Sequence, residues 1–156
     1  MGKEIERKFL VNDNSYRKVC IGVLYKQGYL NSNPERTVRV RIADNKGFLT
    51  IKDRVIGLTR SEFEYEIPYE DAQQILQNIC EKRIIEKTRY KYDYMGYIWE
   101  IDEFHGENEG LVIAEIELDN ENESFSLPEW VGEEVTHDLR YFNSNLITNP
   151  FKSWNK

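Results

Sequence analysis

Hydrophobic and polar residues alternate along most of this chain, which is the pattern of β-strands with one apolar and one polar face. The alternation predicts eight strands, at residues 4–11, 23–31, 37–42, 48–52, 61–67, 84–92, 97–102 and 112–118. Asp44-Asn45-Lys46-Gly47 and Met95-Gly96 are turn sequences that join neighbouring strands into hairpins. Short hairpin links favour antiparallel pairing, and eight strands are enough to close a barrel. The expected fold is therefore α+β: a closed eight-stranded antiparallel β-barrel, or tunnel, with a few flanking helices.

Helical periodicity is strong in only one segment. Apolar residues spaced three and four apart predict an amphipathic helix over residues 69–82, directly after Pro68. Shorter helices are expected at 16–21 and 140–146, and residues 127–130 indicate a turn or a short helix. The tail is expected to pack against the barrel and to restrict one end of it. No repeat, linker or low-complexity run divides the chain, so residues 1–156 are predicted to be a single domain.

The polar faces of the strands carry charges that are sorted by sign. In the first strand Glu4, Glu6 and Lys8 share one face. Later strands carry basic sets (Arg39 and Arg41, Lys52, Lys87 and Arg89) or acidic sets (Glu62 and Glu64, Glu100 and Asp102, Glu115 and Glu117). These faces could be solvated, with the first strand a charged edge that resists aggregation. However, like charges side by side repel each other, so sorting by sign favours a shared function.

Helices can cover only one side of the sheet, so we expect the apolar faces to point outward beneath them and the charged faces to line the barrel. Such an interior is costly unless its charges are paired, solvated or neutralised by a ligand. Carboxylates suit hard divalent cations, and lysine and arginine suit phosphate. A ligand with many negative charges, bound together with divalent cations, would neutralise both sets.

Composition narrows the class of protein. The chain has 156 residues, 40% hydrophobic and 31% charged, with a net charge of −7, which is typical of one globular domain. An acidic chain argues against a nucleic-acid partner. With no signal peptide and no apolar run of membrane-spanning length, a cytoplasmic location without a membrane partner is expected. Cys20 and Cys80 are interpreted as inert core residues, and His105 and His137 as surface residues without zinc.

The ordered set of charged positions resembles the CYTH superfamily, the triphosphate tunnel metalloenzymes. The match runs from Glu4 to Glu117, about three quarters of the chain. The resemblance implies a closed tunnel and divalent-metal-dependent cleavage of a triphosphate. It assigns phosphate binding to Lys8, Arg39, Arg41, Lys52, Lys87 and Arg89. It assigns binding of Mg²⁺ or Mn²⁺, directly or through water, to Glu4, Glu6, Glu62, Glu64, Asp102, Glu115 and Glu117.

Two further residues match a feature of some bacterial inorganic triphosphatases. There, a tyrosine in a Gln-Gly-Tyr-Leu stretch pairs with a lysine near the reacting phosphate, and Tyr29 and Lys87 occupy those positions. A tyrosine in a strand is equally interpreted as a packing residue. Glu100 is either part of the tunnel wall or a salt-bridge partner. The aromatic residues Phe63, Tyr90, Tyr92 and Trp99 lie on apolar faces and are expected in the core.

The leading hypothesis is a hydrolase that removes the terminal phosphate of inorganic triphosphate, with nucleoside triphosphates as slower substrates. An adenylate cyclase or a thiamine triphosphatase would use the same ionic framework. A non-catalytic sensor would bind polyphosphate or a nucleotide without turnover. The chain has no GxxxxGK[ST] loop and no GxSxG motif, which excludes a P-loop NTPase and a serine nucleophile of that type. It carries no signal for an oligomeric state.

Overall fold

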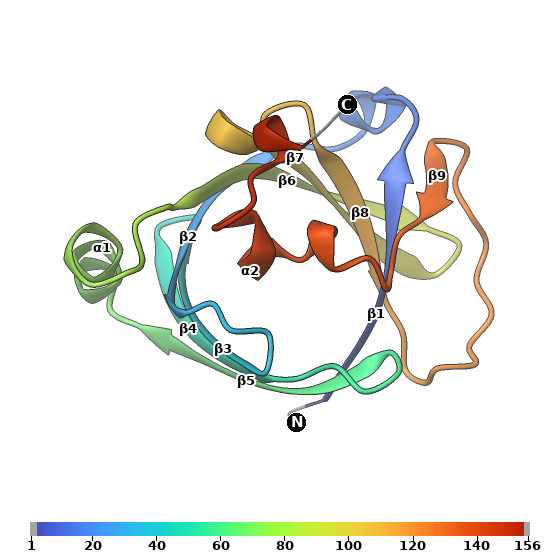
Figure 1. The fold of residues 1–156 in the computed structure, drawn as a ribbon. Coiled ribbons are helices and arrows are strands. Elements are labelled where there is room, and N and C mark those ends of the chain that lie inside the picture. Colours follow the sequence, from blue (N-terminus) through green and yellow to red (C-terminus); the bar gives the residue numbers. More distant parts are fainter. Residues whose placement is uncertain (1–2, 155–156) are drawn as a thin grey trace.

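The computed structural model describes residues 3–154 and shows a closed barrel, seen end-on in Figure 1. Eight strands form its wall: β1 (Lys3–Val11), β2 (Val23–Asn31), β3 (Arg36–Ala43), β4 (Lys46–Asp53), β5 (Thr59–Ile67), β6 (Ile85–Tyr94), β7 (Tyr97–Phe104) and β8 (Val112–Glu117). The strands pair in the order β5-β4-β3-β2-β6-β7-β8-β1, and an antiparallel β1–β5 pairing closes the ring. The predicted fold class is confirmed, as is the number of strands in the wall.

A ninth strand was not predicted. β9 (Val131–Glu134) pairs with the end of β1, opposite Phe9 and Val11. Its four residues are too short to show an alternation in the sequence. The strand is therefore set by its partner, because the free edge of β1 beyond its β5 pairing needs hydrogen-bond partners.

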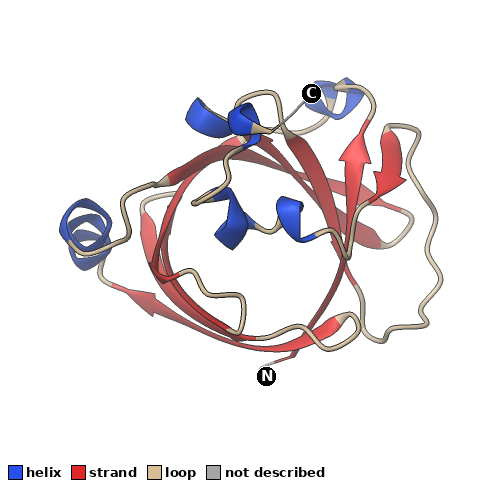
Figure 2. Ribbon diagram, in the orientation of Figure 1, coloured by secondary structure: helices blue, strands red, loops and turns tan. Residues whose placement is uncertain are grey.

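Helices cover less of the barrel than expected. The outer faces of β1, β7 and β8 form an aromatic core that includes Phe9, Trp99 and Ile116. This core is covered by Tyr16 of the 3₁₀ helix η1 (Ser15–Lys18) and by the long segment 119–130, through Phe125 and Trp130. Figure 2 shows that this segment is a loop, so the prediction that helices cover the apolar faces is wrong here.

The one long helix, α1 (Tyr69–Asn78), packs outside β3 and β4. It ends four residues before the predicted Lys82 because tertiary contacts redirect the chain: the Glu81 N–H donates to the carbonyl of Tyr29, and Ser32 donates to the Glu81 carboxylate. Gly28 permits this close approach, since a Cβ there would lie 2.8 Å from the Cys80 sulfur and from Ile84 Cδ1. The glycine of the Gln-Gly-Tyr-Leu stretch therefore serves packing.

The C-terminal tail closes one end of the barrel. Its helical turns are η3 (Leu139–Tyr141), α2 (Asn143–Leu146) and η4 (Phe151–Ser153), and a further turn, η2 (Gly106–Asn108), follows β7. The tail crosses the opening in Figure 1. Its buried residues Val135, Tyr141, Leu146 and Ile147 pack with barrel residues Tyr29, Ile85, Phe104, Leu111 and Ile113. The tail thus restricts one end of the barrel, as expected, and does so as an apolar plug. The barrel residues of this plug lie on strands whose inner faces were expected to be charged.

Several burial predictions can be compared with the structure. Trp99 is fully buried, and Tyr90 and Tyr92 pack against the same cluster, whereas Phe63 is 42% exposed on the uncovered outer face of β5. The prediction that Phe63 is core is wrong because α1 does not reach that face. Both cysteines are half-buried instead of core, and both histidines are on the surface as predicted. Within residues 3–154, none of the helices is long and apolar enough to cross a membrane.

Candidate active site

The middle of the barrel encloses a cavity of about 180 Å³ whose wall is almost entirely polar. Seven carboxylates line it: Glu4, Glu6, Glu62, Glu64, Glu100, Glu115 and Glu117. Seven cationic side chains line it as well: Lys8, Arg39, Arg41, Lys52, Arg60, Lys87 and Arg89. Tyr29, Thr37 and the tail residues Phe142, Asn143 and Ser144 complete the wall. The charged faces of the strands therefore converge on one enclosed space.

Barrel closure sorts these charges into two arcs. Strands β7, β8, β1 and β5 are consecutive around the wall, although β5 is far from the others in sequence, and they carry all seven carboxylates. Strands β4, β3 and β6, with β2 between the last two, carry Lys52, Arg39, Arg41, Lys87 and Arg89. Lys8 and Arg60 are the two cations within the acidic arc. The β1–β5 pairing creates the continuous acidic arc, and the sequence order does not show it.

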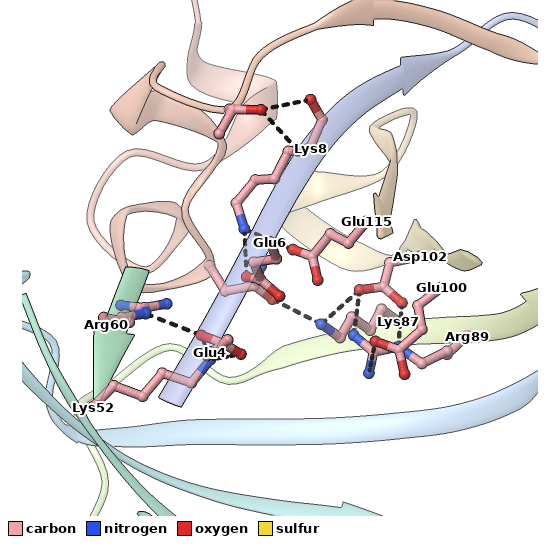
Figure 3. A network of polar contacts seen from close by, with 12 residues as sticks. Glu4, Glu6, Lys8, Lys52, Arg60, Lys87, Arg89, Glu100, Asp102 and Glu115 are labelled. Atoms are coloured by element: carbon pink, nitrogen blue, oxygen red, sulfur yellow. Dashed lines mark hydrogen bonds and ion pairs between the residues drawn. The ribbon is translucent and has the colours of Figure 1, made fainter. Parts of the chain in front are cut away.

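Ion pairs surround β1 at one side of the cavity, and the Lys52–Glu4 pair joins the two arcs (Figure 3). Glu4 accepts from Lys52 at 3.1 Å and from Arg60 at 3.2 Å. Burial opposes ionisation of Glu4, but Lys52 and Arg60 outweigh it and lower its pKa. Lys8 donates to Glu115 at 2.7 Å and to Glu6 at 3.1 Å. Burial disfavours the Lys8 ammonium, yet Glu115 and Glu6 raise its pKa above the usual value.

A second ionic cluster lies on β6 and β7. Arg89 donates two hydrogen bonds to Asp102, at 2.7 and 2.9 Å, and contacts Glu100 at 3.2 Å. The Lys87 ammonium lies 2.8 Å from Asp102 Oδ2, the oxygen that also accepts one of the two Arg89 hydrogen bonds. Burial would raise the pKa of Asp102, but Arg89 and Lys87 hold it far below its usual range. Burial also lowers the pKa of Lys87, to about 8, despite the attraction of Asp102.

Asp102 does not line the cavity, unlike the other predicted metal ligands. Both of its oxygens are engaged by Lys87 and Arg89, and its side chain is only 3% exposed. The structure therefore places Asp102 behind two phosphate-binding candidates. Its role as a metal ligand stays a prediction, and the position itself fits a group that orients Lys87 and Arg89.

The arginines of β3 have unused donors. Arg41 contacts Glu64 at 3.2 Å, and Arg39 lies 3.8 Å from the same carboxylate. Their two Nε atoms are buried and have no partner within residues 3–154. Burial, together with Arg39 and Arg89, lowers the pKa of Arg41 to about 10. Unpaired buried donors beside mutually repelling cations are the complement of a bound anion.

The carboxylates of the cavity wall repel one another and fit a cation, as the arginines fit an anion. Burial and the neighbouring Glu4 and Glu6 raise the pKa of Glu117 to about 7, and no ion pair to Glu117 is present among the described residues. Burial likewise raises the pKa values of Glu62 and Glu100. Oxygen ligands crowded enough to repel one another fit a hard divalent cation. Within the described part of the chain no three acidic, histidine or cysteine side chains converge as a formed metal site, so a cation would draw carboxylates from their present partners.

Tyr29 lines the cavity at the border of the apolar plug and is 3% exposed. Its hydroxyl oxygen accepts a hydrogen bond of 3.4 Å from the Gln27 side-chain nitrogen. The hydroxyl proton has no acceptor in residues 3–154, so it is available to a ligand oxygen. The packing interpretation of Tyr29 is therefore confirmed, and its catalytic role stays a prediction.

Sequence reasoning located most of this site but missed several residues. All predicted site residues except Asp102 line the cavity, and Glu100, left open, is both wall and ion-pair partner. Arg60 was missed because the fifth strand was expected to begin at Ser61, whereas it begins at Thr59 and alternation places Arg60 beside Glu62 and Glu64. The tail residues Phe142 to Ser144 have no periodic signal. Only the folded tail brings them to the cavity.

In this closed antiparallel barrel a basic arc faces an acidic arc. Proteins of this class can hold a polyanion inside the barrel. Residues 2–150 match the CYTH domain, and the chain belongs to this family. It is 54% identical over 154 residues to an inorganic triphosphatase of Acetivibrio thermocellus, covering 99% of both chains. It is 37% identical over 150 residues to an inorganic triphosphatase of Nitrosomonas europaea, covering 92% of this chain and 95% of the relative.

Solved structures show the same relationship. The crystal structure of the inorganic triphosphatase NE1496 matches with a TM-score of 0.63 at 34% identity, covering 92% of this chain and 96% of that one. A putative adenylyl cyclase from Hippeastrum, described as having a dominant triphosphatase activity, matches with a TM-score of 0.56 at 17% identity, covering 75% and 80%. The match to the Hippeastrum protein shows a shared fold and nothing further.

Proposed function

We propose that this protein is a divalent-metal-dependent hydrolase that cleaves the terminal phosphate of inorganic triphosphate. The observation that carries the proposal is the enclosed cavity, in which five cations on β3, β4 and β6 face seven carboxylates. Phosphoryl transfer depends mainly on positioning and charge neutralisation, and this arrangement supplies both. The two curated relatives named inorganic triphosphatase support the same activity.

The nature of the wall favours a bare triphosphate over a nucleotide. The cavity holds about 180 Å³ and offers almost no apolar surface on which a purine or a thiazole ring could stack. One end is filled by the apolar plug, so a base or vitamin moiety could only project from the open end. Nucleoside triphosphates are accordingly expected to be slower substrates.

The basic arc would bind the substrate. Arg39 and Arg41 present planar guanidinium groups with free donors, which suit two oxygens of one phosphate. Lys52 and Arg89 add charge on either side, each held by a carboxylate. On the opposite arc the glutamates would hold Mg²⁺ or Mn²⁺, and such an ion supplies charge neutralisation and activation of a water.

Lys87 and Tyr29 are the candidates for groups near the reacting phosphate. Hydrolysis breaks the bond between the terminal phosphorus and its bridging oxygen, which leaves on pyrophosphate, while a water oxygen bonds to that phosphorus. The Lys87 ammonium can neutralise or protonate the leaving oxygen, since burial brings its pKa to about 8. The Tyr29 hydroxyl can donate a hydrogen bond to a phosphate oxygen.

The open end of the barrel is acidic. Carboxylates shared with the cavity wall continue outward to Asp119 and Glu123, beside the β6–β7 turn. Such an opening repels a bare polyanion, so we infer that the triphosphate reaches the cavity as its complex with a divalent cation. No nucleic acid or membrane enters this proposal, and the proposed location is cytoplasmic.

Phosphate release from tripolyphosphate, ATP and thiamine triphosphate, measured in parallel with Mg²⁺, with Mn²⁺ and with EDTA, tests the proposal. We expect chelator-sensitive release that is fastest with tripolyphosphate. No release from any substrate in the presence of metal would refute a hydrolase.

The other functions give different results when the products from ATP and the binding of tripolyphosphate are measured beside phosphate release. Cyclic AMP and pyrophosphate from ATP would indicate a cyclase, and preference for thiamine triphosphate would indicate that hydrolase instead. Tight binding of tripolyphosphate without turnover would indicate a sensor. A matched control with reduced but measurable turnover is Lys87→Ala, which removes one charge near the proposed leaving group.

A further inference from the structure

The environment of Lys87 includes a residue from the tail that the proposed function does not use. The Lys87 side chain is 2% exposed, and its ammonium contacts Asp102 at 2.8 Å and the side-chain oxygen of Asn143 at 2.9 Å. An ammonium has three protons to donate. Two are thus taken by protein oxygens, and because Lys87 lines the cavity, the third remains for a ligand.

Asn143 is held in one orientation. Its side-chain oxygen accepts from Lys87 and also from the Gln27 side-chain nitrogen at 3.2 Å. Lysine can only donate, so the amide oxygen and not the amide nitrogen of Asn143 must face it. Gln27 is fully buried on β2 and fixes the same oxygen from the other side.

The backbone of Asn143 is positioned by the apolar plug. Asn143 is the first residue of α2, and Leu146 and Ile147, which follow it, are buried among Ile85, Phe104 and Ile113. Asn143 and Lys87 are 56 residues apart in sequence. Apolar packing of the tail therefore places the uncharged Asn143 in the wall of the ionic cavity, where it contacts the Lys87 ammonium.

From this geometry we propose that Asn143 is a positioning residue for the triphosphatase reaction, which holds the Lys87 ammonium between Asp102 and the bound phosphate. Without it, Asp102 is the sole protein acceptor left to Lys87 among the contacts of the described residues, and the attraction draws the ammonium away from the cavity. The inference rests on the proposed function. It adds the C-terminal tail to the catalytic machinery.

Steady-state kinetics of Asn143→Ala on tripolyphosphate with Mg²⁺ test this role. We expect kcat to fall about 10- to 100-fold, the size of one lost hydrogen bond to a charged group at a reacting centre, and KM to change by about threefold or less. The matched control is Asn149→Ala, the same change on the exposed part of the tail, where the side-chain oxygen contacts only Ser153 among residues 3–154. It should keep wild-type kinetics. Equal kcat for the two variants would overturn the proposal.

Two further variants separate positioning from mere docking of the tail. Asn143→Asp keeps an acceptor for Lys87, so it should lose less kcat than Asn143→Ala, while its added charge raises KM by repelling phosphate. In a Lys87→Ala background, Asn143→Ala should have no further effect on kcat, because both changes act through one group. A full additional loss in the double variant would show that Asn143 supports the fold alone, and would overturn the proposal.

A crystal structure of Asn143→Ala gives a result that is independent of turnover. We expect the plug to be intact and the Lys87 ammonium to have moved toward Asp102. An ammonium in its original place would refute the positioning role even if the wild-type protein proved inactive. Conversely, inactivity of the wild-type protein would refute the proposed function and leave this structural comparison to decide the role of Asn143.

Discussion

The ionic cavity and the apolar plug are two regions of one barrel interior, built from the same strands but opposite in polarity. β6 contributes Lys87 to the ionic cavity and Ile85, two residues earlier, to the apolar plug. β8 does the same with Glu115 and Ile113. Each pair shares the inward face, since side chains two apart on a strand point the same way. The polarity of the interior therefore changes along the strands, at one level of the barrel.

This change separates stability from function. The plug buries apolar side chains in contact with the tail, and such burial stabilises the fold directly. The cavity contains charges whose pairing only offsets the cost of removing them from water. We infer that variants in the cavity change activity far more than stability, and that variants in the plug do the reverse.

Arg41→Ala gives the largest expected effect on the functional side. We expect kcat/KM for tripolyphosphate to fall by about 10²–10³, the size found when a preorganised donor to a reacting oxyanion is removed. Stability should be unchanged or higher, because burial, Arg39 and Arg89 already disfavour the Arg41 cation. Kinetics and thermal unfolding check both parts. Arg41→Lys, which keeps the charge but loses the planar fork, should recover part of the rate; a large loss of stability in either variant would contradict the separation.

Ile147→Ala tests the plug. This residue is 5% exposed, and its truncation should cost about 2–4 kcal/mol of unfolding free energy, or roughly 5–15 °C in Tm for a domain of this size. Below the transition, kcat should stay within about threefold of wild type, because Ile147 does not line the cavity and Tyr141 and Leu146 still hold Asn143 in place. Denaturant unfolding and an assay at 25 °C provide the measurements. Loss of activity in a fully folded variant would show that the two regions are coupled.

The pH dependence of activity sharpens the comparison at a single residue. Lys87 carries its charge below a pKa of about 8 and loses it above. If the ammonium acts in turnover, kcat/KM should decline above pH 8, approaching tenfold per pH unit. The profile of kcat/KM against pH measures this decline. A flat profile up to pH 10 would contradict the loss of a required Lys87 charge near pH 8.

Glu117→Gln should give the smallest of these effects, a shift in Tm that depends on pH. The folded-state pKa of Glu117 is about 7, above its usual 4.5, so the folded protein binds the extra proton and loses stability as the pH rises toward 7. At pH 4, below both the folded and the unfolded pKa, the Glu117 carboxyl is largely neutral in both states, and the two proteins should have nearly equal Tm. At pH 8, without metal, the glutamine variant should melt a few degrees higher. Added Mg²⁺ should narrow or reverse this difference, since only the carboxylate can bind it. A constant offset in Tm at both pH values would contradict this account.

Some structural details depended on contacts that a local pattern does not contain. Helix α1 stops at Asn78 because Glu81 is captured by Tyr29 and Ser32, although apolar spacing continues to Cys80. Phe63 was expected in the core because its strand alternates, but alternation identifies a face and does not show whether anything covers that face. Each error marks a place where a distant segment decides burial or the end of an element.

The sequence by itself determined the closed antiparallel barrel, the inward direction of the charged faces and nearly all of the charged cavity wall. It could do so because strand periodicity and the sign of a charge are local properties. Only the tertiary structure decided how the arcs are arranged, since closure of β1 on β5 joins strands far apart in sequence. It also decided the apolar plug and the contact of Asn143 with Lys87, because both depend on the docking of a tail without periodicity. The withdrawn place of Asp102 was likewise a tertiary result, because Lys87 and Arg89 of the neighbouring strand engage both of its oxygens.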